Sequence, residues 1–228
     1  MSKYKTILFD VDGTLLDFDK AQDYALNYMF EKYNIPLTTQ TRKIYDDINH
    51  GLWKQFELGL IDKKTVVYTR FVKLFEVLNV DLDGRAFEDE YQYTLGQGFF
   101  VLDHAKEVLE NLYQDYDLYI VTNGVSSTQY SRQKGSGIDR FFKDVFVSED
   151  VGYQKPAKEY FDYCFKKIGQ IDLEKTIIIG DSLSSDIQGG INAGIDTCWY
   201  NPKQMKQTIP STYTITDLRE LYHILKGE

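Results

Sequence analysis

The apolar residues of this chain recur with two different spacings, and the spacing changes as the sequence is followed. Between about residues 17 and 95 they return every three or four positions, as Val67, Phe71, Leu74 and Leu78 do. That spacing is the period of an amphipathic helix. On either side of this stretch, short continuous apolar runs alternate with helical patterns. Such runs are typical of strands that are buried on both faces of a parallel sheet.

Five of these runs predict strands, because each is short and ends at turn or polar residues. Their alternation with amphipathic helices predicts an α/β fold, a doubly wound parallel sheet with helices on both faces. The predicted strands are residues 7–9, 118–121, 145–147, 176–179 and 196–200. Helices are expected over 105–112, around Phe161 and Cys164, from the capping-box sequence Ser185-Asp186-Ile187-Gln188, and over 218–225.

The helical stretch predicts an inserted domain, because it interrupts the α/β pattern after the first strand. We expect residues 17–96 to form this all-helical insert, and residues 1–16 together with 97–228 to form the α/β domain. The sequence Gly96-Gln97-Gly98 supplies a hinge for the returning chain. The first helix is expected to start at Asp17 or Asp19 and to bury one face, made of Ala21, Ala25, Tyr28 and Met29.

Composition narrows the class of partner and the compartment. The formal net charge of -9 argues against a nucleic-acid backbone or an anionic membrane surface as the main partner. The two cysteines, Cys164 and Cys198, lie in apolar segments, which predicts buried thiols and fits a reducing cytoplasm. The apolar run after the basic N-terminus is too short for a signal peptide or membrane span. We expect a cytoplasmic monomer or weak homodimer that acts on a small molecule.

The first predicted strand ends in a pair of carboxylates, Asp10 and Asp12. Alternation along an extended chain directs both side chains to the same side, with Val11 on the other. Two like charges held together are costly unless a cation or a shared proton compensates them. The pair therefore indicates a metal-assisted carboxylate nucleophile, although an exposed Asp-Gly turn would explain the same residues.

Three predicted strands end in polar residues, at Asp10, at Thr122 and at Gly180-Asp181. Ligands bind parallel sheets at the carboxyl ends of the strands, so these residues are expected to meet at one edge. Asp10 could attack phosphorus, and Asp12 could protonate the leaving alcohol and later activate water. Asp181 and Asp186 supply further carboxylates for an oxygen-liganded Mg²⁺. Asp186 could instead be only a favourable charge in a first helical turn.

A second group of residues could hold the phosphoryl oxygens. Thr122 offers a hydroxyl, Asn123 and Gly124 follow it directly, and Lys155 supplies the positive charge that a phosphoryl transition state requires. Each has an ordinary alternative, because a Thr-Asn-Gly sequence is a common turn and most lysines before a loop proline are solvated. Their order along the chain, each at a strand end or in the loop after one, favours the functional interpretation.

The chain resembles the haloacid dehalogenase (HAD) superfamily, whose four motifs it matches in order. The resemblance spans the whole chain and implies a Rossmann-like core, and the helical insert resembles that superfamily's C1 cap. The matching motifs are Asp10-Val11-Asp12-Gly13-Thr14, Thr122-Asn123, Lys155-Pro156 and Gly180-Asp181-Ser182-Leu183-Ser184-Ser185-Asp186.

The resemblance implies a role for each motif residue. Asp10 would be the nucleophile, and Asp12 the general acid and base, with its backbone carbonyl bound to Mg²⁺. Thr122 and Lys155 would bind the phosphoryl group. Asp181 would ligate the metal, and Asp186 would support that site. The implied activity is Mg²⁺-dependent phosphomonoester hydrolysis through an aspartyl-phosphate.

Within the superfamily, two stretches are similar to the noncanonical pyrimidine 5′-nucleotidases, which act on pyrimidine nucleoside monophosphates. These stretches are residues 180–202 and residues 48–59. In the second, Trp53 and Phe56 could stack a base and Asn49 could read an amide edge, although packing inside the helical insert explains the two aromatic residues equally well.

Other activities stay open on the sequence alone. A phosphoglycolate-type or other small-metabolite phosphatase would use the same motifs. A phosphosugar mutase or a non-catalytic binding protein fits less well. Dehalogenation is disfavoured by Asp12 and Asp181, because dehalogenases of this superfamily lack the second acid and the Mg²⁺ site.

Overall fold

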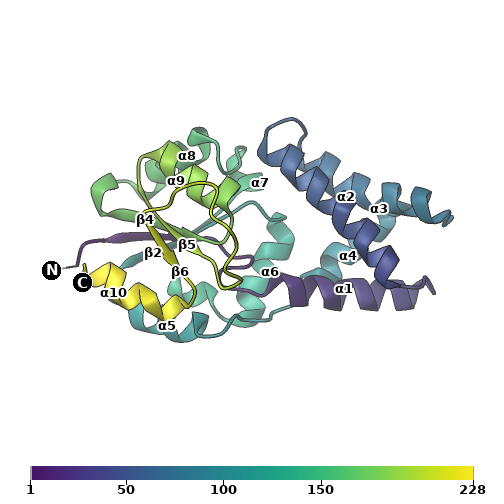
Figure 1. Ribbon diagram of the computed structural model, residues 1–228, viewed down its shortest axis with the longest axis horizontal. Coiled ribbons are helices and arrows are strands. Elements are labelled where there is room, and N and C mark those ends of the chain that lie inside the picture. The colour runs from purple at the N-terminus through teal and green to yellow at the C-terminus, as the bar shows by residue number, and fades with distance from the viewer. Residues whose placement is uncertain (1, 228) are drawn as a thin grey trace. The chain divides into compact units, whose positions relative to one another are not determined.

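The computed structural model describes residues 2–227, which divide into two compact units (Figure 1). The core unit comprises Met1–Phe18 and Phe99–Glu228, and the helical unit comprises Asp19–Gly98. The predicted insert, residues 17–96, begins and ends two positions earlier than the helical unit does.

The described part of the core unit contains one six-stranded sheet in which all neighbouring strands are parallel. The strand order is β3-β2-β1-β4-β5-β6, so the α/β doubly wound prediction is confirmed. The short edge strand β6 was not predicted, because its three residues are too few for a periodic pattern. The strands are β1 (Thr6–Phe9), β2 (Asp117–Thr122), β3 (Asp144–Val147), β4 (Thr176–Gly180), β5 (Asp196–Tyr200) and β6 (Tyr213–Ile215).

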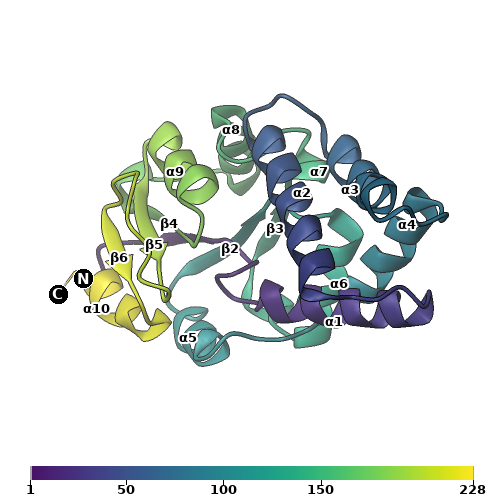
Figure 2. The same cartoon turned by 45° about the vertical axis from the view of Figure 1, so that its right-hand side comes forward.

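Helices cover both faces of this sheet, with α8 and α9 on one face and α5 and α10 on the other (Figures 1 and 2). Side chains of β1 alternate between the two resulting cores, since Leu8 belongs to the cluster that contains Tyr160, whereas Ile7 belongs to the cluster that contains Val108. The core-unit helices are α5 (Ala105–Leu112), α6 (Ser126–Ser136), α7 (Ser148–Val151), α8 (Lys158–Ile168), α9 (Gln188–Ala193) and α10 (Leu221–Lys226). Shorter helical turns are η1 (Asp139–Phe141), η2 (Leu173–Lys175), η3 (Leu183–Ile187) and η4 (Leu218–Glu220).

Three core-unit helices differ from the sequence prediction, and one of them, α7, is a single turn of four residues that was not predicted. The predicted capping box at Ser185 is wrong, because the helical turn already begins after Ser182, whose hydroxyl accepts a hydrogen bond from the backbone N–H of Ser185. Residues 183–187 form a π-helical turn before α9. Helix α6 was not predicted, because its sequence has no apolar periodicity. None of the helices in residues 2–227 is long and apolar enough to cross a membrane.

The helical unit is built from α1 (Phe18–Lys32), α2 (Thr39–Glu57), α3 (Lys63–Leu78) and α4 (Gly84–Leu95). Its interior is largely aromatic, with the Phe71 ring 5.3 Å from Tyr45, 4.7 Å from Phe87 and 5.0 Å from Tyr91 between centroids. The predicted burial of Tyr28 is wrong, because this side chain is 51% exposed. The buried face of α1 includes Ala21, Ala25 and Met29 as expected, but it continues through Gln22, Leu26 and Phe30.

Candidate active site

Asp10 stands at the carboxyl end of the central strand β1. Its backbone N–H donates to the carbonyl of Ile179 at 2.9 Å, which extends the pairing of β1 with β4 by one residue. The chain then turns at Gly13, which has a φ of +81°. A side chain at Gly13 would meet Asp181, since an added Cβ would lie 2.5 Å from Oδ2 of that residue. The glycine therefore lets the first turn pass close to the carboxylate at the end of β4.

Lys155 joins three parts of the core unit at one point. Its buried ammonium donates to Oδ1 of Asp10 at 2.7 Å, to Oδ1 of Asp186 at 2.6 Å and to the carbonyl of Val121 at 2.7 Å. These three acceptors satisfy the three N–H donors of a lysine ammonium. The lysine is therefore held rigidly among the ends of three elements that are distant in sequence.

Asp186 is fixed by the turn that precedes α9. Its Oδ2 accepts the backbone N–H of Ser182 at 3.0 Å, while its Oδ1 accepts from Lys155. An added Cβ at Gly180 would lie 2.2 Å from Cγ of Asp186, so only glycine leaves room for this carboxylate. The carboxylate is 1% exposed and is held by two donors before any ligand is considered.

Asp10, Asp181 and Asp186 form a group whose carboxylate oxygens lie within 4.8 Å of one another. Burial raises the pKa of Asp10 to about 7; Lys155 opposes this rise, while Asp186 and Asp12 add to it. Burial, with Asp10 and Asp186, also raises the pKa of Asp181 well above its usual value. The group thus holds more negative charge than Lys155 compensates. Clustered, partly compensated oxygen donors fit a hard divalent cation such as Mg²⁺.

The loop after β2 supports Lys155 from its backbone. Oδ1 of Asn123 accepts the backbone N–H of Lys155, and Nδ2 of Asn123 donates to its carbonyl, both at 2.9 Å. Thr122 is 1% exposed, and its hydroxyl accepts the N–H of Gly124 at 3.1 Å. The amide of Asn123 therefore positions the lysine, while the role of Thr122, Asn123 and Gly124 in binding a phosphoryl group stays a prediction.

The carboxylate of Asp12 has partners that the sequence did not suggest. Arg132 forms an ion pair with Oδ1 of Asp12, and Nε2 of Gln129 donates to Oδ2 at 2.5 Å. Both residues lie on α6 and are at most 1% exposed. The only sequence signal for these two residues is their spacing of three positions, Gln-x-x-Arg, in the segment after the Thr-Asn-Gly turn. A polar helix face of this kind is usually exposed to solvent, so the spacing did not indicate a contact with Asp12. The Asp12 side chain is thus directed to α6, and a contribution to a metal site would come from its backbone carbonyl, as the resemblance implies.

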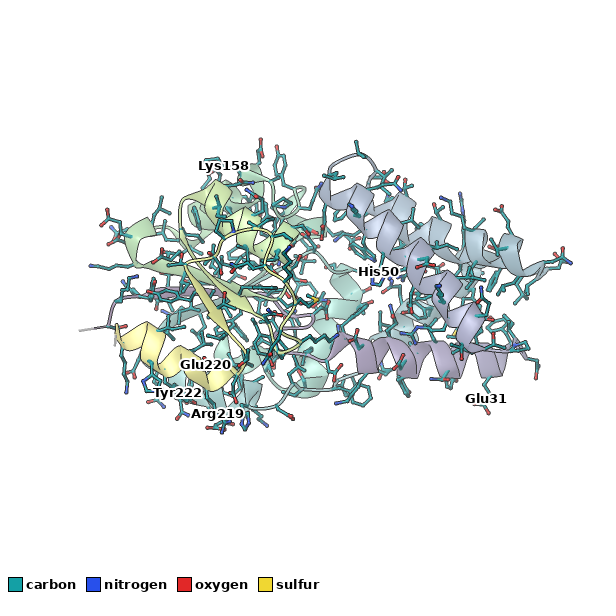
Figure 3. All side chains as sticks on the ribbon, viewed as in Figure 1. Glu31, His50, Lys158, Arg219, Glu220 and Tyr222 are labelled. Atoms are coloured by element: carbon teal, nitrogen blue, oxygen red, sulfur yellow. The ribbon has the colours of Figure 1, made fainter. Side chains whose placement is uncertain are left out.

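The three candidate residues of the helical unit lie on α2. Trp53 and Phe56 pack edge to face with ring centroids 5.6 Å apart, and Phe56 is buried. Asn49 is also buried, and its Oδ1 accepts from Nη1 of Arg70 at 3.0 Å, while Arg70 is paired with Glu88. The neighbouring His50 is exposed on the same helix (Figure 3). A contact of Asn49, Trp53 or Phe56 with substrate stays a prediction.

A comparison with known proteins identifies the family. A family model described as haloacid dehalogenase-like hydrolase matches residues 7–200, which include every motif of the site in the core unit. The chain is a haloacid dehalogenase-like hydrolase. The match confirms the resemblance that the four sequence motifs indicated, and it makes the protein an enzyme of the hydrolase class.

Three relatives match this haloacid dehalogenase-like hydrolase over nearly its full length. YfnB of Bacillus subtilis (strain 168) is 52% identical over 231 residues, covering 100% of this chain and 98% of YfnB. The pyrimidine 5′-nucleotidase PynA of Streptococcus pneumoniae is 40% identical, covering 97% of this chain and 95% of PynA. The pyrimidine 5′-nucleotidase YjjG of Escherichia coli (strain K12) is 33% identical, covering 98% of both chains.

The solved structure of YfnB from Bacillus subtilis is also similar to that of this hydrolase. The two superpose with a TM-score of 0.93 at 51% sequence identity, and the match covers 98% of this chain and 99% of YfnB. That crystal structure contains bound magnesium.

Proposed function

We propose that this hydrolase is a Mg²⁺-dependent phosphomonoesterase that works through an aspartyl-phosphate on Asp10. The observation that carries the proposal is the buried group in which Asp10, Asp181 and Asp186 meet the ammonium of Lys155. A phosphoryl group is anionic, so an attacking carboxylate requires positive charge beside it. Lys155 supplies one such charge, and a divalent cation at the three carboxylates would supply the rest.

In the first step, a carboxylate oxygen of Asp10 attacks the phosphorus atom of the substrate. A bond from that oxygen to phosphorus forms, and the bond from phosphorus to the ester oxygen breaks. The proton of the Asp12 carboxyl passes to the ester oxygen, which leaves as an alcohol. Lys155 holds Asp10 in place and offsets the charge of the phosphoryl oxygens.

In the second step, water removes the phosphoryl group from Asp10. The Asp12 carboxylate takes a proton from a water molecule, whose oxygen attacks phosphorus. The bond between phosphorus and the Asp10 oxygen breaks, which restores the carboxylate and releases inorganic phosphate. Asp12 is then protonated again for the next substrate, so the cycle is balanced.

Asp10 and Asp181 would hold the Mg²⁺ with the backbone carbonyl of Asp12, and Asp186 would support the site. When bound, the cation neutralises phosphoryl charge and orients the reacting oxygens. The raised pKa of both Asp10 and Asp181 supports this assignment, because their buried carboxylates lack sufficient positive charge.

We assign pyrimidine nucleoside monophosphates as the substrate class. Two relatives with 40% and 33% identity over nearly the whole chain are pyrimidine 5′-nucleotidases. Trp53 on α2 is only partly buried and offers aromatic surface for a base, and the buried Phe56 packs against it edge to face. Stacking of a base on an aromatic side chain is worth about 1–3 kcal/mol, which is enough to select among phosphate esters.

Phosphate release from a substrate panel tests both parts of this function. The panel contains UMP, dUMP, dTMP, AMP, GMP, phosphoglycolate and hexose phosphates, each assayed with Mg²⁺ and with a chelator. We expect metal-dependent release that is fastest with the pyrimidine monophosphates. Release mainly from another ester would overturn the substrate class, and conversion of a hexose phosphate to its isomer without free phosphate would overturn hydrolysis.

The Asp10→Asn variant tests the covalent step directly. An amide is a poor nucleophile, so kcat is expected to fall on the order of 10,000-fold. Asp139→Asn makes the same chemical change at an exposed position of η1 and should keep full activity. Substantial turnover by Asp10→Asn would exclude an aspartyl-phosphate on this residue.

A further inference from the structure

Helix α6 buries a polar face, contrary to the usual order of an amphipathic helix. Its four buried side chains are polar or charged, namely Thr128, Gln129, Arg132 and Gln133, with at most 4% exposure. Burial of polar groups costs free energy unless they find hydrogen-bond partners. Helix α6 has no apolar stripe that would offset this cost. Its buried polar face therefore indicates a functional role.

Two residues of this face converge on the two oxygens of one carboxylate. Arg132 pairs with Oδ1 of Asp12, and Gln129 donates to Oδ2 at 2.5 Å. The carboxylate is thus held from both sides by donors one helical turn apart. Such a grip fixes both the position and the rotation of the Asp12 side chain.

The two donors are themselves held by their surroundings. The amide nitrogen of Gln133 donates to Oε1 of Gln129 at 3.3 Å, which directs Nε2 of Gln129 to Asp12. The guanidinium carbon of Arg132 lies 5.6 Å from the centroid of the Phe18 ring. An added Cβ at Gly124 would lie 2.3 Å from Nε2 of Gln129, so this glycine leaves the space that the glutamine occupies.

We propose that Arg132 and Gln129 are positioning residues that hold Asp12 for proton transfer to the leaving oxygen. The inference rests on the proposed function, in which Asp12 is the general acid and base. Neither residue needs to touch the substrate. Their effect acts through the orientation of one carboxylate, since proton transfer requires the acid within hydrogen-bond reach of the leaving oxygen.

This role predicts a dependence on the leaving group. The 4-nitrophenolate anion leaves phosphorus readily without a proton, whereas the alkoxide of a nucleoside requires one. Arg132→Met should lower kcat for the alkyl ester by about 100-fold, the contribution typical of general acid catalysis. It should change kcat for 4-nitrophenyl phosphate by only a few-fold and leave KM for both esters nearly unchanged.

The experiment measures kcat and KM for both esters with the full-length enzyme and saturating Mg²⁺. The alkyl ester is UMP, or the fastest alkyl phosphate of the substrate panel. Gln129→Met should give a smaller loss in the same direction, and Arg132→Lys should recover part of the activity. Arg140→Met is the matched control, since Arg140 is exposed on η1 and pairs only weakly with Glu110 at 3.1 Å.

A double-mutant cycle separates positioning from a structural role. If Arg132 acts through Asp12, the change Arg132→Met should have little further effect on kcat in an Asp12→Asn background. Additive losses, or equal losses with both esters, would overturn the proposal. Thermal unfolding of each variant shows whether a loss of activity is due to misfolding. If Arg132→Met does not fold, the comparison of the two esters with the milder variant Gln129→Met tests the proposal.

The outcomes for the two proposals are distinct. Retained activity in Asp10→Asn would overturn the covalent mechanism whatever Arg132 does. Loss of activity in Asp10→Asn together with equal effects of Arg132→Met on both esters would leave that mechanism standing and overturn the positioning role alone.

Discussion

The ammonium of Lys155 lies 2.7 Å from Oδ1 of Asp10, although the two residues are 145 positions apart in sequence. The parallel sheet makes this contact possible, because the carboxyl ends of β1, β2 and β3 lie at the same edge. Lys155, in the segment after α7, reaches Asp10 across the end of β2, where its ammonium also donates to the carbonyl of Val121. The same ammonium contacts Asp186 at 2.6 Å. One lysine thus compensates two buried carboxylates, so we expect both the chemistry and the stability of the core unit to depend on it.

Replacement of this lysine should reveal both contributions. Lys155→Met leaves Asp10 and Asp186 without their shared cation, so we expect the free energy of unfolding to fall by about 3–5 kcal/mol. Phosphate release should fall to background. Urea unfolding in the presence of a chelator measures the first effect. Lys158→Met, at an exposed lysine on α8 (Figure 3), should change neither quantity appreciably.

Metal binding should stabilise the folded enzyme measurably in the absence of substrate. A ligand at 100 times its dissociation constant adds about 2.7 kcal/mol to the free energy of unfolding. Urea unfolding at increasing Mg²⁺ should show this rise in the wild type and a much smaller one in Asp181→Asn. Asp172→Asn, at an exposed position before η2, serves as the control. An unchanged Mg²⁺ response in Asp181→Asn would exclude Asp181 as a ligand.

The aromatic pair on α2 gives a prediction about selectivity. If Trp53 stacks the base, Trp53→Leu should lower kcat/KM for UMP by about 10- to 100-fold while sparing phosphoglycolate turnover. Leucine retains apolar contact with Phe56, which limits the effect on folding. Tyr93→Leu removes an aromatic side chain that is 75% exposed on α4 and should change neither substrate. An equal loss for both esters would instead assign Trp53 to packing.

The C-terminal segment carries a pH-dependent contribution to stability. The side chain and backbone of Arg219 donate to Asp217 and lower the pKa of that carboxyl to about 2 (Arg219 is labelled in Figure 3). A folded-state pKa below the usual value stabilises the fold above about pH 4. That contribution is lost as the pH falls from about 4 to about 2.

The variant Asp217→Asn tests the direction of this pH dependence of stability. Asparagine still caps η4 but carries no charge, so the wild type should be more stable near neutral pH by less than about 1 kcal/mol. The difference between the two melting temperatures should shrink as the pH falls from about 4 to about 2. A difference that grows over this range would contradict the assignment.

The sequence predicted five of the six strands in the described sheet and the polar residues at the ends of three of them. The runs that contain Leu8 and Ile178 became neighbouring parallel strands, because short continuous apolar segments are typical of strands that are buried on both faces of a sheet. The sequence was a weaker guide to which side chains of a helix are buried and to where a short helical turn begins. Tyr28 lies on the exposed side of α1, and the turn before α9 begins at Ser182 instead of Ser185.

The sequence by itself thus determined the fold class and the family, and it pointed to the carboxylates and the lysine of the site. Only the tertiary structure decided which partner each of them has. Asn123 was expected near phosphoryl oxygens, which stays a prediction, and the structure shows that its amide holds the backbone of Lys155. Arg132 and Gln129 were not expected at all, because a polar helix face looks the same in a sequence whether it meets water or a carboxylate. Hydrophobic periodicity predicts which side chains are buried in the core. The partner of a buried polar group, in contrast, is fixed only when segments distant in sequence fold together.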